Sequence, residues 1–191
     1  MKSQREFLQR LVEKLKSSDI EYMISGSICS GFHGQPRATN DVDIVIKPSK
    51  QQLLCFIASL GPDYYVSEDA ALQALENNLM FNVIDIEAGW KADLIIRKKR
   101  TYSQEEFSRK SPKNLMGMEL DIATPEDSVL SKLEWTKGRA SQMQLNDVLG
   151  ILVVQWNNLD FNYLREWADK LEVGDALEQL VNEARKLRET D

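Results

Sequence analysis

Cysteine and histidine are scarce in this chain of 191 residues, which contains two cysteines and one histidine. Cys29 and Cys55 are too few for a disulfide framework, and their spacing fits no metal-binding motif. We interpret them as free thiols of a cytoplasmic protein, because stable disulfides belong to oxidising compartments. The single histidine, His33, argues against a histidine-rich metal site and against a serine nucleophile activated by histidine. We interpret His33 as a loop residue near the entrance of a site, without a catalytic role.

The sequence also lacks long apolar runs and an excess of positive charge. No stretch reaches the roughly 20 apolar residues of a membrane-spanning helix, and the opening MKSQREFLQRLVEKL has no apolar core of a signal peptide. We therefore expect no association with a membrane. A net charge of −6 argues against a broad nucleic-acid surface. The basic run RKKR at 97–100 is either a solvated loop or a local contact for RNA phosphates.

The chain has enough apolar residues for a core, and its pattern changes near residue 123. Apolar residues make up 42% and charged residues 28%, which are ordinary values for a globular protein. Up to about residue 122, helical patterns alternate with strand patterns. The predicted strands lie at 20–25, 41–47, 64–67, 79–87 and 90–97. From Thr124, which with Pro125 is typical of a helix start, only helices follow. We predict two domains, residues 1–122 and residues 123–191.

Two acids stand at the start of a strongly apolar strand. Asp41 and Asp43 open the segment DVDIVIK, where a charge is costly unless something positive lies against it. Residues i and i+2 of a strand point to the same face, so the two carboxylates project together from Cα atoms roughly 7 Å apart. Such a pair suits Mg²⁺, which favours a few carboxylates together with phosphate oxygens. The alternative is that each acid is an ordinary turn or cap residue.

A metal pair acting on phosphorus normally needs a third carboxylate from another segment. Asp93 is the better candidate, because it is the lone acid near the start of the apolar strand KADLII. Asp85 is the rival, but it stands in mid-strand, where an outward-facing polar residue is the simpler explanation. We predict that Asp41, Asp43 and Asp93 bind divalent cations.

Gly26 and Ser27 follow the predicted strand at 20–25 and open a short predicted helix. Backbone N–H groups and a hydroxyl at a helix start form an anion site that suits the terminal phosphates of a nucleotide. The alternative is a simple turn, since Gly-Ser is a common pair. The position of Gly26-Ser27 shortly before Asp41 favours the anion site.

Together these motifs resemble the nucleotidyltransferase superfamily with the DNA polymerase β-like fold. That pattern is a Gly-Ser pair, a spacer, Asp-x-Asp on a strand and a later lone Asp on another strand. The segment SGSICSGFHGQPRATNDVDIVI is most similar to the small bacterial branch that includes AbiEii-type toxins, in which Arg-x-Thr-x-Asp-x-Asp is typical. The residues that match it are Arg37, Thr39, Asp41 and Asp43.

The resemblance implies an α+β fold, with a small mixed β-sheet and flanking helices followed by a C-terminal helical bundle. It also implies an enzyme that uses Mg²⁺ or Mn²⁺ to transfer a nucleoside monophosphate from an NTP, ATP for example, to a hydroxyl of RNA, protein or a small molecule. Asp41, Asp43 and Asp93 would be the catalytic, metal-binding acids. A toxin role with an antitoxin partner is implied by the branch alone.

The resemblance further implies which residues bind the nucleotide. They are Gly26, Ser27, Arg37, Thr39 and Lys132. For Lys132 a solvent-facing lysine is an equal alternative, and Arg37 either touches phosphate or pairs with a nearby acid. Asp147 either supports the site or stabilises helix packing. The tryptophans of the helical part are interpreted as core residues rather than base-stacking platforms, and they are Trp135, Trp156 and Trp167.

A second hypothesis from another class remains open. The same fold can serve as a non-catalytic binding or regulatory module of a toxin–antitoxin-like pair. The three acids favour the enzyme, because a binding module has no need of three charges at the starts of apolar strands. A metal-dependent phosphohydrolase is a third interpretation, which the lack of histidine ligands disfavours.

Overall fold

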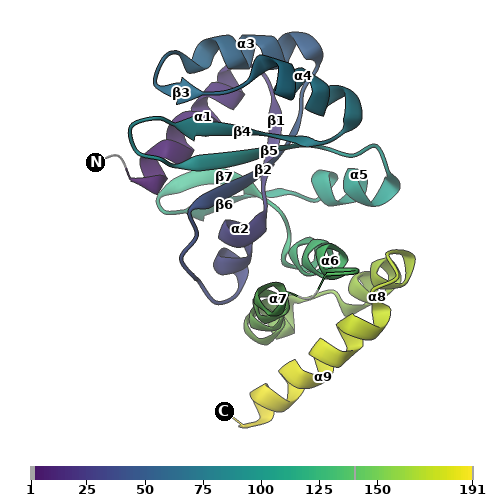
Figure 1. Ribbon diagram of the computed structural model, residues 1–191. Coiled ribbons are helices and arrows are strands. Elements are labelled where there is room, and N and C mark those ends of the chain that lie inside the picture. The colour runs from purple at the N-terminus through teal and green to yellow at the C-terminus, as the bar shows by residue number, and fades with distance from the viewer. Residues whose placement is uncertain (1–2, 140, 191) are drawn as a thin grey trace. The chain divides into compact units, whose positions relative to one another are not determined.

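The structure is a computed structural model that describes residues 3–139 and 141–190 (Figure 1). The chain divides into two compact units. The sheet unit comprises the chain up to Ser25 together with Ala38–Ile122, and the helical unit comprises Gly26–Arg37 and the chain from Ala123 onward. The domain division at residue 122 stays a prediction, because compactness does not show that either part folds alone.

The sheet unit contains a mixed seven-stranded sheet with the strand order β3-β4-β5-β2-β1-β7-β6. The pairs β2–β5 and β1–β7 are parallel, and the other four pairs are antiparallel. The strands are β1 (Glu21–Ile24), β2 (Asp41–Lys47), β3 (Tyr64–Tyr65), β4 (Met80–Asp85), β5 (Lys91–Ile96), β6 (Ser111–Leu115) and β7 (Met118–Ile122). The strands predicted at 79–87 and 90–97 are present as β4 and β5, which pair antiparallel.

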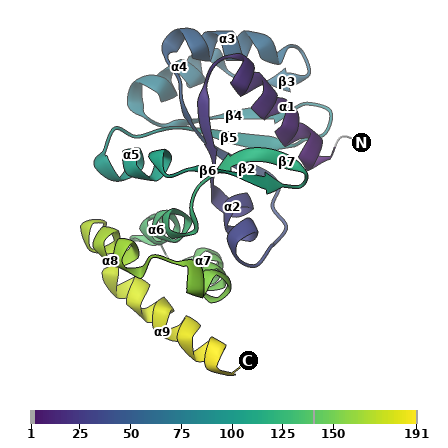
Figure 2. The same ribbon diagram turned by 180° about the vertical axis from the view of Figure 1, so that it is seen from behind.

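The apolar pattern of β2 predicts a strand covered on both faces, and this is only half correct. Its buried residues are Val42, Ile44 and Ile46, which alternate with exposed or half-buried ones. The same alternation appears in β5. The buried face is covered by helices that pack on one another and on the strands: α1 (Gln4–Ser17), α3 (Lys50–Leu60) and α4 (Glu68–Asn77) (Figures 1 and 2). The other face carries the acids.

Local side chains explain where these helices begin. Ser3 and Ser49 each form a reciprocal capping box, with Glu6 and Gln52 respectively, and Ser67 caps α4. A short helix, α5 (Thr101–Ser108), follows the basic run. Thr124 likewise caps the helix that begins at Pro125, as the sequence predicted.

The helical unit consists of helices that pack on one another. They are α2 (Gly26–His33), α6 (Pro125–Thr136), α7 (Gln142–Gln155), α8 (Phe161–Lys170) and α9 (Gly174–Thr190), with a short 3₁₀ turn at Trp156–Asn158. Helix α2 packs against α6 and α7. Gly34, which follows α2, approaches α7 so closely that a Cβ atom there would lie 2.7 Å from the backbone nitrogen of Ile151. Only glycine fits this contact without a shift of backbone.

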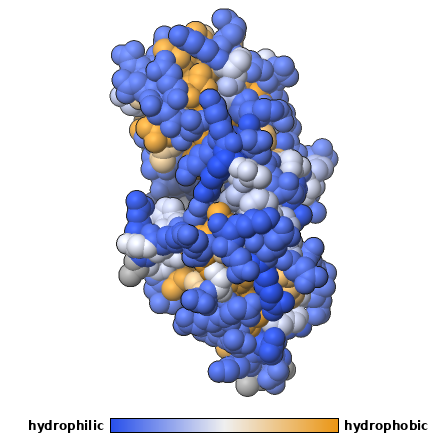
Figure 3. Space-filling model, turned by 90° about the vertical axis from the view of Figure 1, so that its right-hand side faces the viewer, coloured by the Kyte–Doolittle hydropathy of each residue, from blue (hydrophilic) through white to orange (hydrophobic). Residues whose placement is uncertain are grey.

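The face drawn in Figure 3 is mostly hydrophilic, with small separate hydrophobic areas. The tryptophans do not form the predicted core: Trp135 is 49% exposed, and Trp156 and Trp167 are half-buried. No helix in the described part of the chain is both long enough and apolar enough to span a membrane.

Candidate functional site

Strand pairing brings the predicted acids of the sheet unit onto one face. In the parallel pair of β2 and β5, Asp43 stands directly opposite Asp93. Asp41 precedes Asp43 by two residues and therefore shares its face. On the other side of β2, the backbone N–H of Ser25, just after β1, donates to the carbonyl oxygen of Asp43 at 3.0 Å. Adjacent parallel strands thus carry all three carboxylates side by side.

A lysine that the sequence analysis did not single out lies among these acids. Lys91 stands opposite Asp41 in the register, two residues before Asp93. Its Nζ lies 3.3 Å from an oxygen of Asp41 and 3.3 Å from an oxygen of Asp93. Asp41 is half exposed, whereas the side chain of Asp93 is only 14% exposed. Lys91 therefore supplies one positive charge against the three acids from within the sheet.

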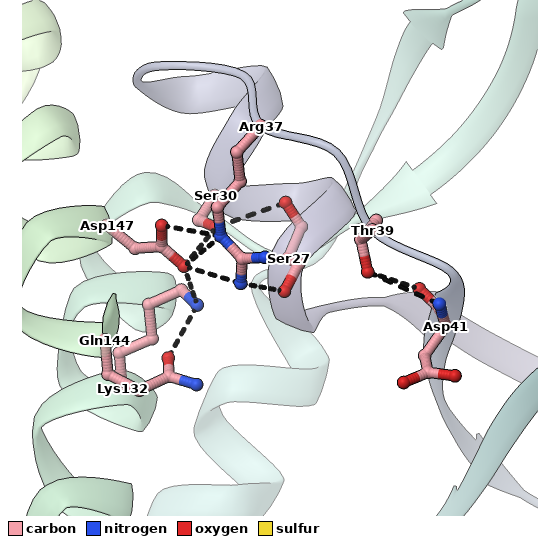
Figure 4. Close-up of polar contacts among 8 residues, drawn as sticks. All are labelled: Ser27, Ser30, Arg37, Thr39, Asp41, Lys132, Gln144 and Asp147. Atoms are coloured by element: carbon pink, nitrogen blue, oxygen red, sulfur yellow. Dashed lines mark hydrogen bonds and ion pairs between the residues drawn. The ribbon is translucent and has the colours of Figure 1, made fainter. Parts of the chain in front are cut away.

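Two further side chains fix the acids. Asn82 on β4 is the register partner of Asp93, and its amide donates to the Asp93 carboxylate at 2.5 Å. The Thr39 hydroxyl donates to the backbone oxygen of Asp41 at 3.1 Å and accepts from its N–H at 3.4 Å (Figure 4). Thr39 therefore shapes the turn into β2 through the backbone of Asp41.

The chemistry of the donors fits Mg²⁺ or Mn²⁺, since carboxylates and an amide oxygen are hard ligands. The positions of the carboxylates do not yet form a metal cage. Within residues 3–139 and 141–190, no three acidic, cysteine or histidine side chains are grouped closely enough to hold an ion. The ammonium of Lys91 is the cation that contacts two of the acids.

Asp85, the rival candidate for the third acid, has a structural role in the turn after β4. The expectation that it faces outward is wrong, because Asp85 is fully buried. Its carboxylate accepts from the N–H groups of Glu87 and Ala88 at 3.1 and 2.9 Å. These bonds stabilise the tight turn between β4 and β5, so burial and hydrogen bonding explain this acid.

The Gly-Ser pair opens α2 in the helical unit. Gly26 has a φ of +60°, a backbone conformation that residues other than glycine adopt only at a cost in free energy. This explains why glycine stands where the chain turns from β1 into the helix. The hydroxyl of Ser27 accepts a hydrogen bond from the guanidinium of Arg37. The predicted anion site at Gly26 and Ser27 therefore has an arginine beside it.

Arg37 belongs to a network around one carboxylate, that of Asp147 on α7 (Figure 4). Nε of Arg37 lies 3.1 Å from Asp147, and Nζ of Lys132 lies 2.8 Å from it. Lys132 also donates to Gln144 at 2.8 Å, and Ser30 donates to Asp147 at 3.3 Å. Arg37 and Lys132 therefore share the one carboxylate of Asp147.

Lys132 and Asp147 are both buried, and their ion pair holds the charge of each. Lys132 is 6% exposed, so the solvent-facing alternative is wrong. Burial by itself would raise the pKa of Asp147, but hydrogen bonds from Arg37 and Lys132 outweigh it and hold that pKa below its usual value. Asp147 therefore stays ionised and fixes both cations. Arg37 thus pairs with an acid, one of the two alternatives, and whether Asp147 supports a site or stabilises helix packing stays open.

His33 is not a loop residue. It ends α2, is 5% exposed, and its Nε2 lies 2.8 Å from the carbonyl oxygen of Ala123. His33 thus connects α2 to the segment before α6 within the helical unit, which is a structural role.

Comparison with known proteins gives structural neighbours only, because no family model and no curated protein matches the chain. An antigenic nucleotidyltransferase-like protein from Paracoccidioides brasiliensis is 17% identical, with a TM-score of 0.64 over 95% of this chain and 88% of that chain. The lincosamide antibiotic adenylyltransferase LnuA with lincomycin bound is 13% identical, with a TM-score of 0.54 over 78% of this chain and 96% of that chain. ANT(2")-Ia in complex with adenylyl-2"-tobramycin is 12% identical, with a TM-score of 0.53 over 94% of this chain and 95% of that chain.

The chain has a nucleotidyltransferase-like fold. The α+β prediction, a mixed sheet with flanking helices and a helical C-terminal part, is confirmed by the neighbours and by the strand order. Identities of 12–17% establish the fold and leave the activity to be argued from the chain's own residues.

Proposed function

We propose that this protein is a nucleotidyltransferase that moves a nucleoside monophosphate from an NTP to a hydroxyl group of an acceptor. One observation carries the proposal: Asp43 and Asp93 are register partners on β2 and β5, with Asp41 on the same face, in a nucleotidyltransferase-like fold. Three acids on one face of a sheet are costly without a cationic ligand, so a function must explain them.

In this proposal the acids of the sheet unit bind Mg²⁺ or Mn²⁺. Bound there, a divalent cation would neutralise charge that develops on the phosphate oxygens. Asp41 and Asp43 would supply ligands from one strand, and Asp93 would supply one from the neighbouring strand. Asp93 would also accept the proton of the attacking hydroxyl. Asn82 and Thr39 would hold Asp93 and the backbone of Asp41 in place.

In the helical unit, the start of α2 would bind the phosphates. The backbone N–H groups near Gly26 and the hydroxyl of Ser27 are donors, and Arg37 adds a cation beside them. Lys132 would act through its ion pair with Asp147, since its ammonium is buried. The two cations of this network, Arg37 and Lys132, suit an anion of several charges, such as a triphosphate.

The reaction balances without a further reactant. The acceptor oxygen forms a bond to the α-phosphorus, and the bond from that phosphorus to the bridging oxygen of the β-phosphate breaks. Pyrophosphate leaves with the bonding electrons, and the hydroxyl proton passes to the carboxylate of Asp93 and then to solvent. Positioning and charge neutralisation supply most of the acceleration in phosphoryl transfer.

For the acceptor we favour a small molecule. LnuA and ANT(2")-Ia are described with lincomycin and with adenylylated tobramycin, both small molecules. RNA and protein acceptors, the AbiEii-type branch, a toxin role and an antitoxin partner rest on the sequence resemblance and are less well supported.

A non-catalytic module with the same fold is the second candidate, and one observation favours it. Lys91 already pairs with Asp41 and Asp93. If that pairing were permanent, the acids would stabilise the sheet and bind no metal.

One assay separates the two candidates. The protein is incubated with each of four α-labelled NTPs, Mg²⁺ or Mn²⁺, and panels of small-molecule, RNA and protein acceptors. The enzyme is expected to transfer label and release pyrophosphate, and Asp41→Asn combined with Asp43→Asn should abolish both. Absence of transfer with every acceptor, together with no binding of NTP or Mn²⁺, would favour the non-catalytic module.

A further inference from the structure

We propose that the ammonium of Lys91 is a built-in counter-ion of the candidate metal site, which a divalent cation must displace. Lys91 would thereby set the affinity of the site for metal. The inference rests on the proposed function, because it assumes that Asp41, Asp43 and Asp93 bind the cation.

The strand register places Lys91 where a metal would compete with it. Lys91 stands opposite Asp41 and precedes Asp93 by two residues, so its side chain projects from the same face as both acids. Its Nζ lies 3.3 Å from one oxygen of each acid. A single cation therefore already bridges carboxylates from two strands.

An ammonium and a divalent ion cannot use these oxygens in the same way. Magnesium needs oxygens at about 2.0–2.1 Å in nearly octahedral geometry, whereas the oxygens of Asp41 and Asp93 are arranged around the larger ammonium at 3.3 Å. Two positive ions among the same carboxylates would also repel each other. Binding of metal therefore requires Lys91 to withdraw and the carboxylates to close up.

Lys91 is well suited to this exchange. Its side chain is 35% exposed, which leaves it a path toward solvent. Its ammonium is 3.3 Å from both Asp41 and Asp93, so Lys91 relieves part of the repulsion among the acids of the metal-free protein.

The proposal is tested by titrating the whole protein with Mn²⁺ and measuring the concentration of free Mn²⁺ from its EPR signal. Lys91→Met removes the competing charge, and we expect it to bind Mn²⁺ about tenfold more tightly than the unaltered chain. Lys91→Arg keeps the charge and should bind about as weakly as the unaltered chain. Lys47→Met is the matched control, because Lys47 lies on β2 but pairs with the exposed Glu21. It changes the net charge equally and should leave affinity unaltered.

Thermal unfolding gives a second readout that does not depend on activity. Without metal, Lys91→Met should lower the melting temperature, because the acids then repel one another. With saturating Mn²⁺ its melting temperature should rise more than that of the unaltered chain. A fold that is intact by circular dichroism makes the affinities comparable.

The outcomes separate the two proposals. If Lys91→Met binds Mn²⁺ no more tightly than Lys47→Met, while Asp41→Asn with Asp43→Asn abolishes binding, the metal site stands and the role of Lys91 is overturned. If neither the unaltered chain nor Lys91→Met binds Mn²⁺ in a manner that depends on Asp41 and Asp43, the metal site itself is overturned.

Discussion

Asp43 and Asp93 stand opposite each other on the parallel strands β2 and β5, about 50 residues apart in the chain. Their neighbours in the same register are Asp41 and Lys91. The pairing of β2 with β5 therefore brings these three acids and one lysine together on one face of the sheet.

The first prediction concerns Asp93. Asp93→Asn keeps the size of the side chain but removes a charged ligand and the proton acceptor. We expect nucleotide transfer to fall at least about a hundredfold, with a melting temperature close to that of the unaltered protein. Glu76→Gln, which removes an exposed acid on α4, is the control and should leave the rate unchanged. Normal transfer by Asp93→Asn would remove this residue from the mechanism.

The register explains what the sequence predicted and what it missed. The face shared by Asp41 and Asp43 follows from spacing alone. Lys91 was missed because its contact with Asp41 depends on how β2 and β5 align, which no local pattern encodes. A basic residue two positions before the lone Asp93 was the available signal. Asp85 and Asp93 looked alike locally, and only burial and the turn after β4 distinguish them.

The helical unit offers a similar lesson. Gly26 and Ser27 were identified because a strand ending in Gly-Ser is a local signal. Arg37 and Lys132 lie 110 and 15 positions from Asp147, so their partnership with it depends on how α6 and the segment after α2 pack against α7. Trp135 and His33 were misassigned for the same reason, since burial is decided by packing.

The second prediction concerns the ion network. Asp147→Asn leaves Arg37 and Lys132 close together with no charged partner. Breaking a buried ion pair in this way costs about 3 kcal/mol, which urea unfolding would measure. Glu166→Gln is the control: it breaks an exposed pair with Lys170 and should cost less than about 1 kcal/mol. If Asp147→Asn lowered the free energy of unfolding as little as the control does, the network would contribute little to stability.

The third prediction is the pH dependence of that loss. The pKa of Asp147 is lower in the folded chain than usual, so its stabilising effect is complete above the unfolded value of about 3.9. As the pH falls through the lower, folded value, Asp147 takes up a proton and the effect disappears. The difference in unfolding free energy between the unaltered chain and Asp147→Asn should therefore shrink below about pH 4. A difference that stays constant down to pH 2 would contradict the ion pairs.

The fourth prediction concerns Gly34. A methyl group there would lie 2.7 Å from the nitrogen of Ile151 and 2.8 Å from the carbonyl carbon of Gly150. Since both are backbone atoms, Gly34→Ala should destabilise the protein by about 2 kcal/mol in urea unfolding. Gly89→Ala has open space but a φ of +72°, and should cost about 1 kcal/mol. Equal losses of unfolding free energy for Gly34→Ala and Gly89→Ala would indicate that the loop after α2 shifts easily to accept a methyl group.

The most direct test of the metal site is the anomalous diffraction of manganese in crystals of the protein grown with Mn²⁺ and a non-hydrolysable NTP. The account predicts an anomalous peak within about 2.2 Å of oxygens from Asp41 and Asp43, with Asp93 adjoining and Lys91 turned away. A crystal in which manganese binds elsewhere, while Lys91 still bridges Asp41 and Asp93, would contradict it.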